Sequence, residues 1–122
     1  MASVLTEIVI DCNDVRVVAD FWSAVLGWAV QESERGELWM SASGDHTARP
    51  FLVFEPVDEK KTVKDRVHID VNPTGCEQAE ELERLLALGA TQVNVGQPDD
   101  VPWVVLADPE GNEFCLLRRR ID

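Results

Sequence analysis

The feature that most constrains this chain is an internal repeat, in which the same order of elements occurs twice, about 60 residues apart. In each copy, an alternating strand-like run leads to a helix-like run that ends at Leu-Gly, and three short strand-like runs follow. The letters agree at three places: EIVI (7–10) with HIDV (68–71), Leu26-Gly27 with Leu88-Gly89, and Trp39-Met40 with Trp103-Val104. Two successive βαβββ modules are the simplest explanation.

In the first module, LTEIVIDC at residues 5–12 predicts a strand, and DVRVVADFWSAVLGW has the apolar spacing of a helix. Asn13 or Asp14 can cap the start of this helix, and Gly27 can end it in the left-handed conformation. Strand-like runs follow at residues 28–31, 37–42 and 51–57.

In the second module, RVHIDV at residues 66–71 predicts the first strand. Thr74 and Glu77 form a T-x-x-E capping box, which predicts a helix that closes at Gly89. Its expected apolar stripe is Ala79, Leu82, Leu85 and Leu86. Strand-like runs follow at residues 91–95, 103–107 and 113–117.

The last two strands are joined by a turn in VVLADPEGNEFCLL. Asp108 can hydrogen-bond back to the backbone, Pro109 presets φ at the second turn position, and Gly111 suits the fourth. The second of these strands carries Cys115 between two apolar residues, so alternation sends the thiol to the opposite face from them.

Pleating divides the residues of each predicted sheet between two faces. The face expected to pack under the helices carries Ile8, Ile10, Val67, Ile69 and Val71. The opposite face carries Glu7, Val9, His68, Asp70, Cys115 and Leu117. Two half-barrel sheets facing each other would bring the second set into one cavity.

With 122 residues and 45% hydrophobic composition, the chain can bury a substantial core. We therefore expect an α+β fold in one domain over residues 1–122, with module one at about 3–57, a charged linker at about 58–66 and module two at about 67–120. The two modules would form a curved, incompletely closed mixed β-sheet cavity.

The charge of the chain limits its partners. A net charge of −12, from 23 acidic and 11 basic residues, argues against nucleic acid and anionic membranes, which both require a basic face. A neutral or cationic small organic molecule is a better expected partner. The three cysteines are an odd number without a C-x-x-C pair, which favours reduced thiols and a cytoplasmic protein.

The stretches FWSAVLGW, RVHIDV, LLALGAT and WVVLADPEGNEFCLL together resemble the glyoxalase-like family of the vicinal oxygen chelate superfamily, over essentially the whole chain. The resemblance implies a cavity that often holds one divalent metal, with ligands from the first and last strands of both modules. The matching positions are Glu7, His68, Cys115 and a residue within FLVFE, where Glu55 is the one side chain able to ligate and an apolar neighbour is the alternative.

Cys115 stands where the family usually has a glutamate, which removes a ligand or base and disfavours hard-metal chemistry. We therefore expect no cofactor and no tightly bound metal. The alternative is zinc or nickel held by Glu7, His68, Glu55 and Cys115, since zinc accepts nitrogen, thiolate and carboxylate donors.

Two tryptophans, Trp39 and Trp103, occupy the matching third strands, where an indole can stack on a planar or cationic ligand instead of packing in the core. Asp70 and Cys115 complete the expected ligand-binding set, with the thiol expected to shape the cavity more than to react.

Two classes of function remain open. The first is a binding protein similar to the drug-sequestering bleomycin-resistance branch. The second is a glyoxalase-type lyase or isomerase, with Glu7 and Glu55 as acid/base candidates and His68 as metal ligand or catalytic partner. The resemblance also implies a homodimer, since tandem modules of this superfamily commonly pair.

Overall fold

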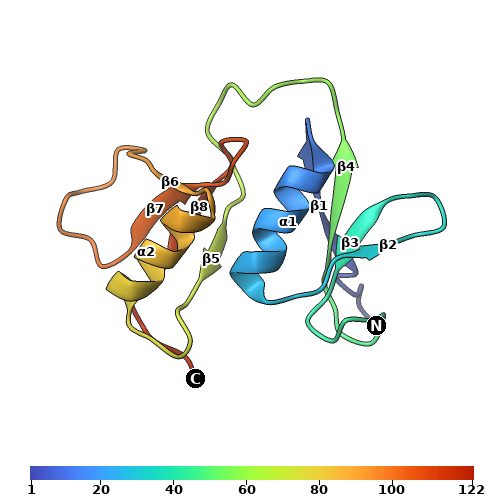
Figure 1. Ribbon diagram of the computed structural model, residues 1–122, viewed down its shortest axis with the longest axis horizontal. Helices are drawn as coiled ribbons and strands as arrows, with labels where there is room; N and C mark the ends of the chain where they lie inside the picture. The colour runs from blue at the N-terminus through green and yellow to red at the C-terminus, as the bar shows by residue number, and fades with distance from the viewer. The chain divides into compact units, whose positions relative to one another are not determined.

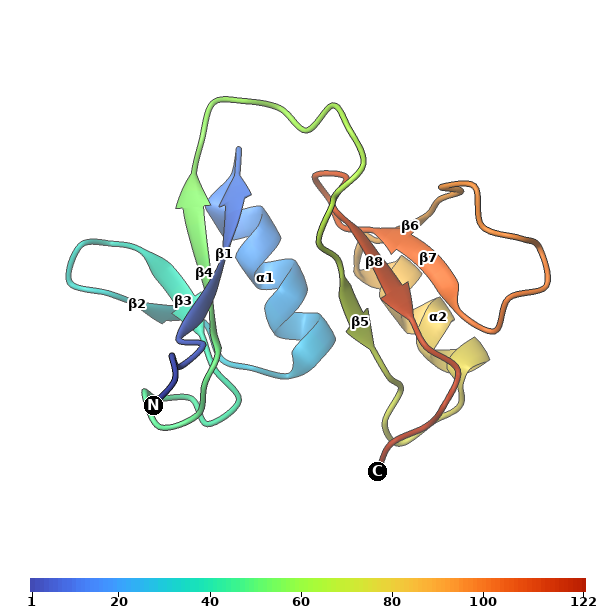
Figure 2. The same ribbon diagram turned by 180° about the vertical axis from the view of Figure 1, so that it is seen from behind.

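The computed structural model describes residues 1–122, which divide into unit 1, Met1–Lys60, and unit 2, Lys61–Asp122 (Figures 1 and 2). Each unit contains one helix and one open four-stranded mixed sheet. The predicted α+β class with two βαβββ modules is therefore confirmed. Neither helix is long and apolar enough to cross a bilayer.

Unit 1 is built from β1 (Glu7–Cys12), α1 (Val15–Leu26), β2 (Gln31–Glu32), β3 (Leu38–Met40) and β4 (Phe51–Pro56). Its strands lie in the order β1-β4-β3-β2. The first and last strands, β1 and β4, pair in parallel, and the other two pairs are antiparallel. The chain therefore returns at β4 to the strand from which it started.

Unit 2 repeats this arrangement with β5 (Ile69–Val71), α2 (Gln78–Leu88), β6 (Thr91–Gln92), β7 (Val104–Ala107) and β8 (Glu113–Leu116). The strand order is β5-β8-β7-β6, and β5 pairs in parallel with β8. The internal repeat seen in the amino-acid sequence is thus also a repeat of sheet topology.

Helix α1 has the ends that its sequence predicts. The side chain of Asp14 accepts a hydrogen bond from the Val17 amide at 3.2 Å, and Gly27 ends the helix at φ 71° with its amide bonded to the Ser23 carbonyl. The helix buries Val18 and Trp22 and lies against β1, β3 and β4. Both the predicted capping residues and the predicted apolar stripe of this helix are therefore confirmed.

Helix α2 differs from its prediction at the start. The T-x-x-E capping box is wrong: Gly75 adopts φ 73°, the helix begins at Gln78, and Glu77 is the N-cap without a side-chain capping bond. The glycine amide instead donates to Asp122 Oδ1 at 2.7 Å. The predicted end at Gly89 is confirmed, at φ 118°.

The predicted apolar stripe of α2 is also largely wrong. Leu85 is buried, but Leu86 is 40% exposed, and the buried row contains Glu81. Burial of this carboxylate is tolerated because Arg84 binds it through two hydrogen bonds, of 2.7 and 2.8 Å. The spacing of leucines in the sequence does not predict that a glutamate is buried and neutralised by a neighbouring arginine.

The predicted alternation of the first strands holds, with one exception. Ile8, Ile10, Ile69 and Val71 are half-buried, whereas their alternate neighbours are exposed. Val67, expected under the helix, is 82% exposed. The reason is that β5 begins only at Ile69, so Val67 precedes the pleated segment.

The turn before β8 is organised by Asp108, which is 3% exposed. Its Oδ1 accepts from the amides of Glu110 and Asn112 at 2.9 and 3.0 Å, and its Oδ2 accepts from Asn112 Nδ2 at 2.9 Å. Gly111 follows at φ 92°, a conformation that favours glycine. The predicted turn is therefore confirmed, and it sets where β8 begins.

The segment between β3 and β4 folds around Asp45. Its Oδ1 accepts from Ser43 Oγ at 2.7 Å, Thr47 Oγ1 at 2.6 Å and the Thr47 amide at 2.9 Å. The hydrogen bonds from Thr47 and Ser43 lower the pKa of Asp45 to about 2. The carboxylate thus holds this segment in place in its ionised form.

We predict that Asp108→Ala lowers the free energy of unfolding by about 1–3 kcal/mol, because three donors lose their buried acceptor. Urea unfolding followed by tryptophan fluorescence measures this change. Asp99→Ala, in the exposed segment after β6, is the control and should stay within about 0.5 kcal/mol of wild type. Equal midpoints for the two variants would contradict the role given to Asp108.

We also predict acid loosening of residues 43–47. Because folding lowers the pKa of Asp45 from 3.8 to about 2, its contribution is complete above about pH 4 and is lost as the pH falls toward 2. Amide exchange of Thr47, followed by NMR with Leu52 in β4 as the global reference, should show this transition. Asp45→Asn cannot titrate and should lack it; identical profiles would refute the assignment.

Candidate functional site

One face of the unit 2 sheet borders a cavity of about 470 Å³. Its walls come from β5, β7 and β8 and from the segments that precede β5 and β7. Among the lining residues are His68, Asp70, Trp103, Val105, Cys115 and Leu117. The cavity is thus mostly apolar, with a few polar side chains converging on it.

Strand register explains why these residues meet. Asp70 pairs with Cys115 across β5 and β8, and Cys115 pairs with Val105 across β8 and β7, so the three form one row across the sheet. His68 and Trp103 lie just before β5 and β7, each two residues before a member of this row, and both line the same cavity. The predicted common face of His68, Asp70 and Cys115 is confirmed.

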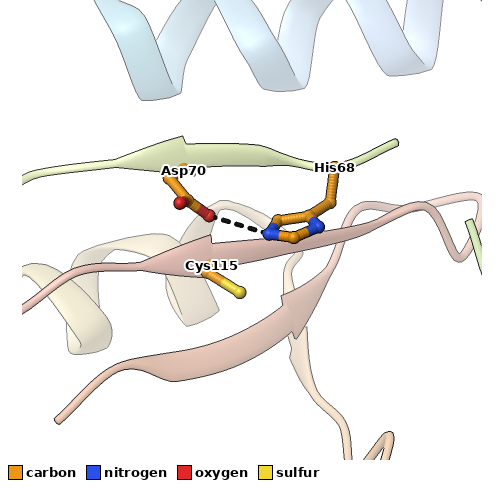
Figure 3. A group of neighbouring side chains, drawn as sticks. All are labelled: His68, Asp70 and Cys115. Atoms are coloured by element: carbon orange, nitrogen blue, oxygen red, sulfur yellow. Dashed lines mark ion pairs between the residues drawn. The ribbon is translucent and has the colours of Figure 1, made fainter. Parts of the chain in front are cut away.

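The polar part of the cavity contains a histidine and a carboxylate from the same strand. His68 Nε2 lies 3.1 Å from Asp70 Oδ1 (Figure 3), and the two side chains are 46% and 45% exposed. This contact orients the imidazole, although a contact so open to water contributes little to stability. Both side chains remain accessible from the cavity.

Cys115 is a free, partly buried thiol beside this pair. Its pKa is raised above the ordinary value, first by burial and then by the charge of Asp70 and the hydrogen bond to it, against a smaller opposite effect of Lys64. The thiol is therefore neutral near pH 7 and a weak nucleophile. This supports the interpretation that Cys115 shapes the cavity more than it reacts.

The three side chains also form a cluster of potential metal donors. An imidazole nitrogen, a carboxylate oxygen and the thiol sulfur all lie within 4.8 Å of one another (Figure 3). Zinc accepts all three donor types, so the residues fit a divalent metal of that class. Two of them, His68 and Cys115, belong to the set that the sequence suggests, whereas Asp70 was expected only to contact a ligand.

The two glutamates of the expected site lie apart on the unit 1 sheet. Glu7 pairs with Phe51 at the start of β1, and Glu55 pairs with Asp11 near its end. Four residues along a strand correspond to about 13 Å. The two carboxylates are thus at opposite ends of the β1 and β4 pair.

Register also identifies the unit 1 equivalent of Cys115. Val9 corresponds to Asp70 in the repeat, and its partner on β4 is Val53. The apolar alternative within FLVFE is therefore the structural match, and Glu55 lies two residues beyond it. Unit 1 offers no donor at this position.

The two tryptophans do not occupy equivalent positions. Trp39 pairs with Val53, whereas Val105 pairs with Cys115, so Val105 is the equivalent of Trp39. The match of Trp39-Met40 with Trp103-Val104 is thus wrong by two residues. Trp103 precedes β7 and lines the unit 2 cavity with 38% of its surface exposed.

Trp39 is instead covered within unit 1. Its ring stacks on His46 with the centroids 4.4 Å apart and the planes 18° from parallel, and Phe51 lies 5.5 Å away. His46 belongs to the segment that Asp45 organises. One face of the Trp39 indole is therefore already occupied by a side chain of its own unit.

Part of the segment expected as a charged linker is attached to unit 2. Lys61 Nζ donates to Glu113 Oε1 at 2.9 Å, and the Asp65 amide donates to Glu113 Oε2 at 3.1 Å. Burial alone would raise the pKa of Glu113, but these hydrogen bonds bring it below its ordinary value. The anchored segment carries Lys64 to the cavity wall.

Comparison with solved structures shows the same fold over nearly the whole chain. The fosfomycin resistance protein FosX from Listeria monocytogenes has a TM-score of 0.70 at 18% identity, covering 96% of this chain and 91% of that chain. FosX from Mesorhizobium loti has a TM-score of 0.68 at 16% identity, with 95% and 92% covered. One structure of the Listeria protein, a mutant, contains Mn(II) and 1S,2S-dihydroxypropylphosphonic acid.

A third structure, of a glyoxalase/bleomycin resistance protein/dioxygenase family enzyme from Burkholderia phytofirmans PsJN, has a TM-score of 0.61 at 20% identity and covers 93% of this chain and 97% of that chain. No curated protein matches this sequence. Residues 7–117 match the family model described as a glyoxalase-like domain. The chain therefore belongs to the glyoxalase-like domain family, within the vicinal oxygen chelate superfamily.

Proposed function

We propose that this protein binds a small organic molecule in the unit 2 cavity, with Trp103 as the stacking surface and the His68 and Asp70 pair as the polar contacts. The observation that carries the proposal is a large apolar cavity into which a half-exposed indole and two polar side chains converge. Such a combination is the usual form of a small-molecule site.

The chemistry of the cavity favours planar, neutral or cationic ligands. The indole of Trp103 attracts aromatic rings and cations through its face. Asp70 contributes a carboxylate, and the chain as a whole carries a net charge of −12, which raises the local concentration of cations. An aromatic cation would satisfy both contacts at once.

Binding without chemistry is favoured by Cys115. The family usually has a glutamate, which can serve as the base for proton abstraction of the glyoxalase type, at the position where this sequence has the thiol of Cys115. Because the pKa of this thiol is raised, it is not an effective base near pH 7. The proposed role is therefore sequestration of a ligand, as in the bleomycin-resistance branch.

A lyase or isomerase of the glyoxalase type is the second candidate. It is favoured by the close approach of His68, Asp70 and Cys115, which could hold a divalent metal, and by the Mn(II) in the structure of the FosX mutant. Either Glu7 or Glu55, which lie at opposite ends of the β1 and β4 pair, is then the proposed acid/base group, with His68 as metal ligand or catalytic partner. Metal-dependent turnover of a hemithioacetal by the purified protein would favour this candidate over sequestration.

We further propose a cytoplasmic location. None of the three cysteines, Cys12, Cys76 and Cys115, belongs to a disulfide bond in the structure. Proteins of oxidising compartments commonly pair their cysteines, whereas the cytosol keeps thiols reduced. The cysteine usage of this chain is therefore that of a protein in a reducing compartment.

We also propose that the protein is a homodimer. Both sheets have open edges, and exposed strand edges favour pairing with a second chain. Sedimentation equilibrium at micromolar concentration should give twice the 13.6 kDa of one chain. A monomer throughout the accessible concentration range would contradict this proposal without affecting the cavity.

For the cavity we predict that Trp103→Ala weakens binding of a planar aromatic cation by about 3- to 30-fold, because one stacking surface is lost. A thermal-shift screen of such cations, led by ethidium, identifies a binder, and calorimetry measures its Kd. His68→Ala should also weaken binding.

The matched control is Leu86→Ala. Leu86 is 40% exposed, close to the 38% of Trp103, and belongs to the same unit, but it does not line the cavity. Its removal should leave the Kd unchanged. If ethidium binds all variants equally, or if no planar cation shifts the unfolding temperature, the proposed cavity site is wrong.

A further inference from the structure

We propose that a second, polar pocket beside the unit 2 cavity recognises a hydroxyl-rich group such as a sugar ring, so that the protein binds planar aromatic glycosides. The inference deepens the proposed function and rests on it, because the aromatic part of the ligand occupies the unit 2 cavity. It is carried by two pockets that share part of their walls and differ in the chemistry of their side chains.

The second pocket, called the loop pocket below, has a volume of about 550 Å³ and lies within the loop that connects β6 to β7. This loop, residues 93–103, leaves the sheet widely before it returns (orange in Figure 1). Three residues, Gln97, Trp103 and Val105, line both the loop pocket and the unit 2 cavity. The two spaces therefore adjoin, with the Trp103 indole at their boundary.

Hydrogen bonds hold this loop at both ends and within its first half. The Val93 amide donates to the Val105 carbonyl at 3.0 Å, and Gln78 Nε2 donates to the Pro102 carbonyl at 2.9 Å. Between these anchors, Gln97 Oε1 accepts from a backbone amide of the loop at 2.8 Å. The loop pocket is therefore largely preformed, which lowers the entropic cost of binding a ligand there.

Exposed polar side chains of the loop pocket can form hydrogen bonds with a ligand. They are Gln92, Asn94 and Asp99. Asn94 Oδ1 accepts from the Gly96 amide at 2.7 Å, which leaves its Nδ2 as a donor for a ligand. The side chains of Gln92 and Asp99 make no hydrogen bond within the chain. The pocket thus offers both donors and acceptors.

These groups match a sugar ring better than a second aromatic ring. Each sugar hydroxyl donates and accepts hydrogen bonds, which suits two amide side chains and one carboxylate. The C–H face of the sugar ring is apolar and can pack on the Trp103 indole. An aromatic ring in the same place would displace water from the polar groups without replacing its hydrogen bonds. A simple organic cation would use Asp99 but neither amide.

The two pockets together define a ligand with two parts. The unit 2 cavity is mostly apolar and accepts the planar aromatic part, whereas the loop pocket accepts the hydroxyl-rich part. Once one part is bound, the contact of the other is intramolecular and therefore occurs at a high effective concentration. A glycoside is thus expected to bind more tightly than the same aromatic ring without its sugar.

The test compares two neutral, fluorescent ligands with the same ring system. They are 4-methylumbelliferyl β-glucoside and 7-methoxy-4-methylcoumarin, in which a methyl group replaces the sugar. We expect wild type to bind the glucoside about 10-fold more tightly, the effect of a few additional hydrogen bonds. Fluorescence titration measures both Kd values.

Asp99→Ala and Asn94→Ala should each weaken binding of the glucoside by about 3- to 10-fold and leave the Kd of the methoxycoumarin unchanged, because each removes a contact to the sugar. The matched control is Asp100→Ala, which removes the same charge from the next residue, outside the linings of both pockets. It should change neither Kd. Trp103→Ala should weaken binding of both ligands, because the indole lines both pockets.

Specific outcomes would overturn the inference. Equal or weaker binding of the glucoside by wild type would show that the loop pocket does not recognise the sugar. Equal losses in Asp99→Ala and Asp100→Ala would assign the effect to the overall charge of the loop. Binding of ethidium without binding of either coumarin would refute this inference and leave the cavity site intact, whereas loss of all three would refute both.

Discussion

The parallel pairing of the first and last strands in each unit is the constraint on which the rest of the structure depends. It brings Asp70 beside Cys115 in unit 2 and Val9 beside Val53 in unit 1, although these partners are more than forty residues apart. Parallel strands cannot be joined by a tight turn, so the helix and the two intervening strands must bridge them. In unit 2 the Asp108 turn then determines where β8 starts, and so which side chain faces Asp70.

The two units share one topology, but different side chains fill the equivalent positions of their sheets. In unit 1, Trp39 is stacked by His46, which belongs to a segment held by the ionised Asp45. In unit 2, Val105 takes the position equivalent to Trp39, and Trp103 lies at the edge of an open cavity. The side chain at the centre of the sheet face is thus smaller in unit 2, and the indole lies further out, where it lines the cavity.

The chemistry of this cavity depends on whether the thiol of Cys115 is protonated. Without a metal, burial and the neighbouring charge of Asp70 raise the pKa of the thiol and keep it neutral. A divalent cation would reverse this balance, because a metal-bound thiol is deprotonated outright. The same three side chains would therefore take part in either of the two proposed functions.

Much of this arrangement follows from local sequence. The elements within each copy of the repeat, the cap at Asp14, the helix ends at Gly27 and Gly89, and the side of its own strand on which Cys115 lies depend on neighbours within a few residues, where spacing and backbone preference decide. The order of the helices and strands, and with it the resemblance to the family, could be predicted from the sequence for the same reason.

Tertiary structure decided what depends on partners distant in the chain. Sequence comparison alone matched Trp39 with Trp103 and left Glu55 as the one candidate ligand in FLVFE. Strand register shows instead that Val105 is the equivalent of Trp39 and that Val53 is the equivalent of Cys115. Glu81 is buried because Arg84 neutralises it, which a count of leucines cannot show. Alternation within a strand determines the face on which a side chain lies. The residue opposite that side chain depends on which strand is the neighbour and in what register the two strands pair, and only the folded sheet determines this pairing.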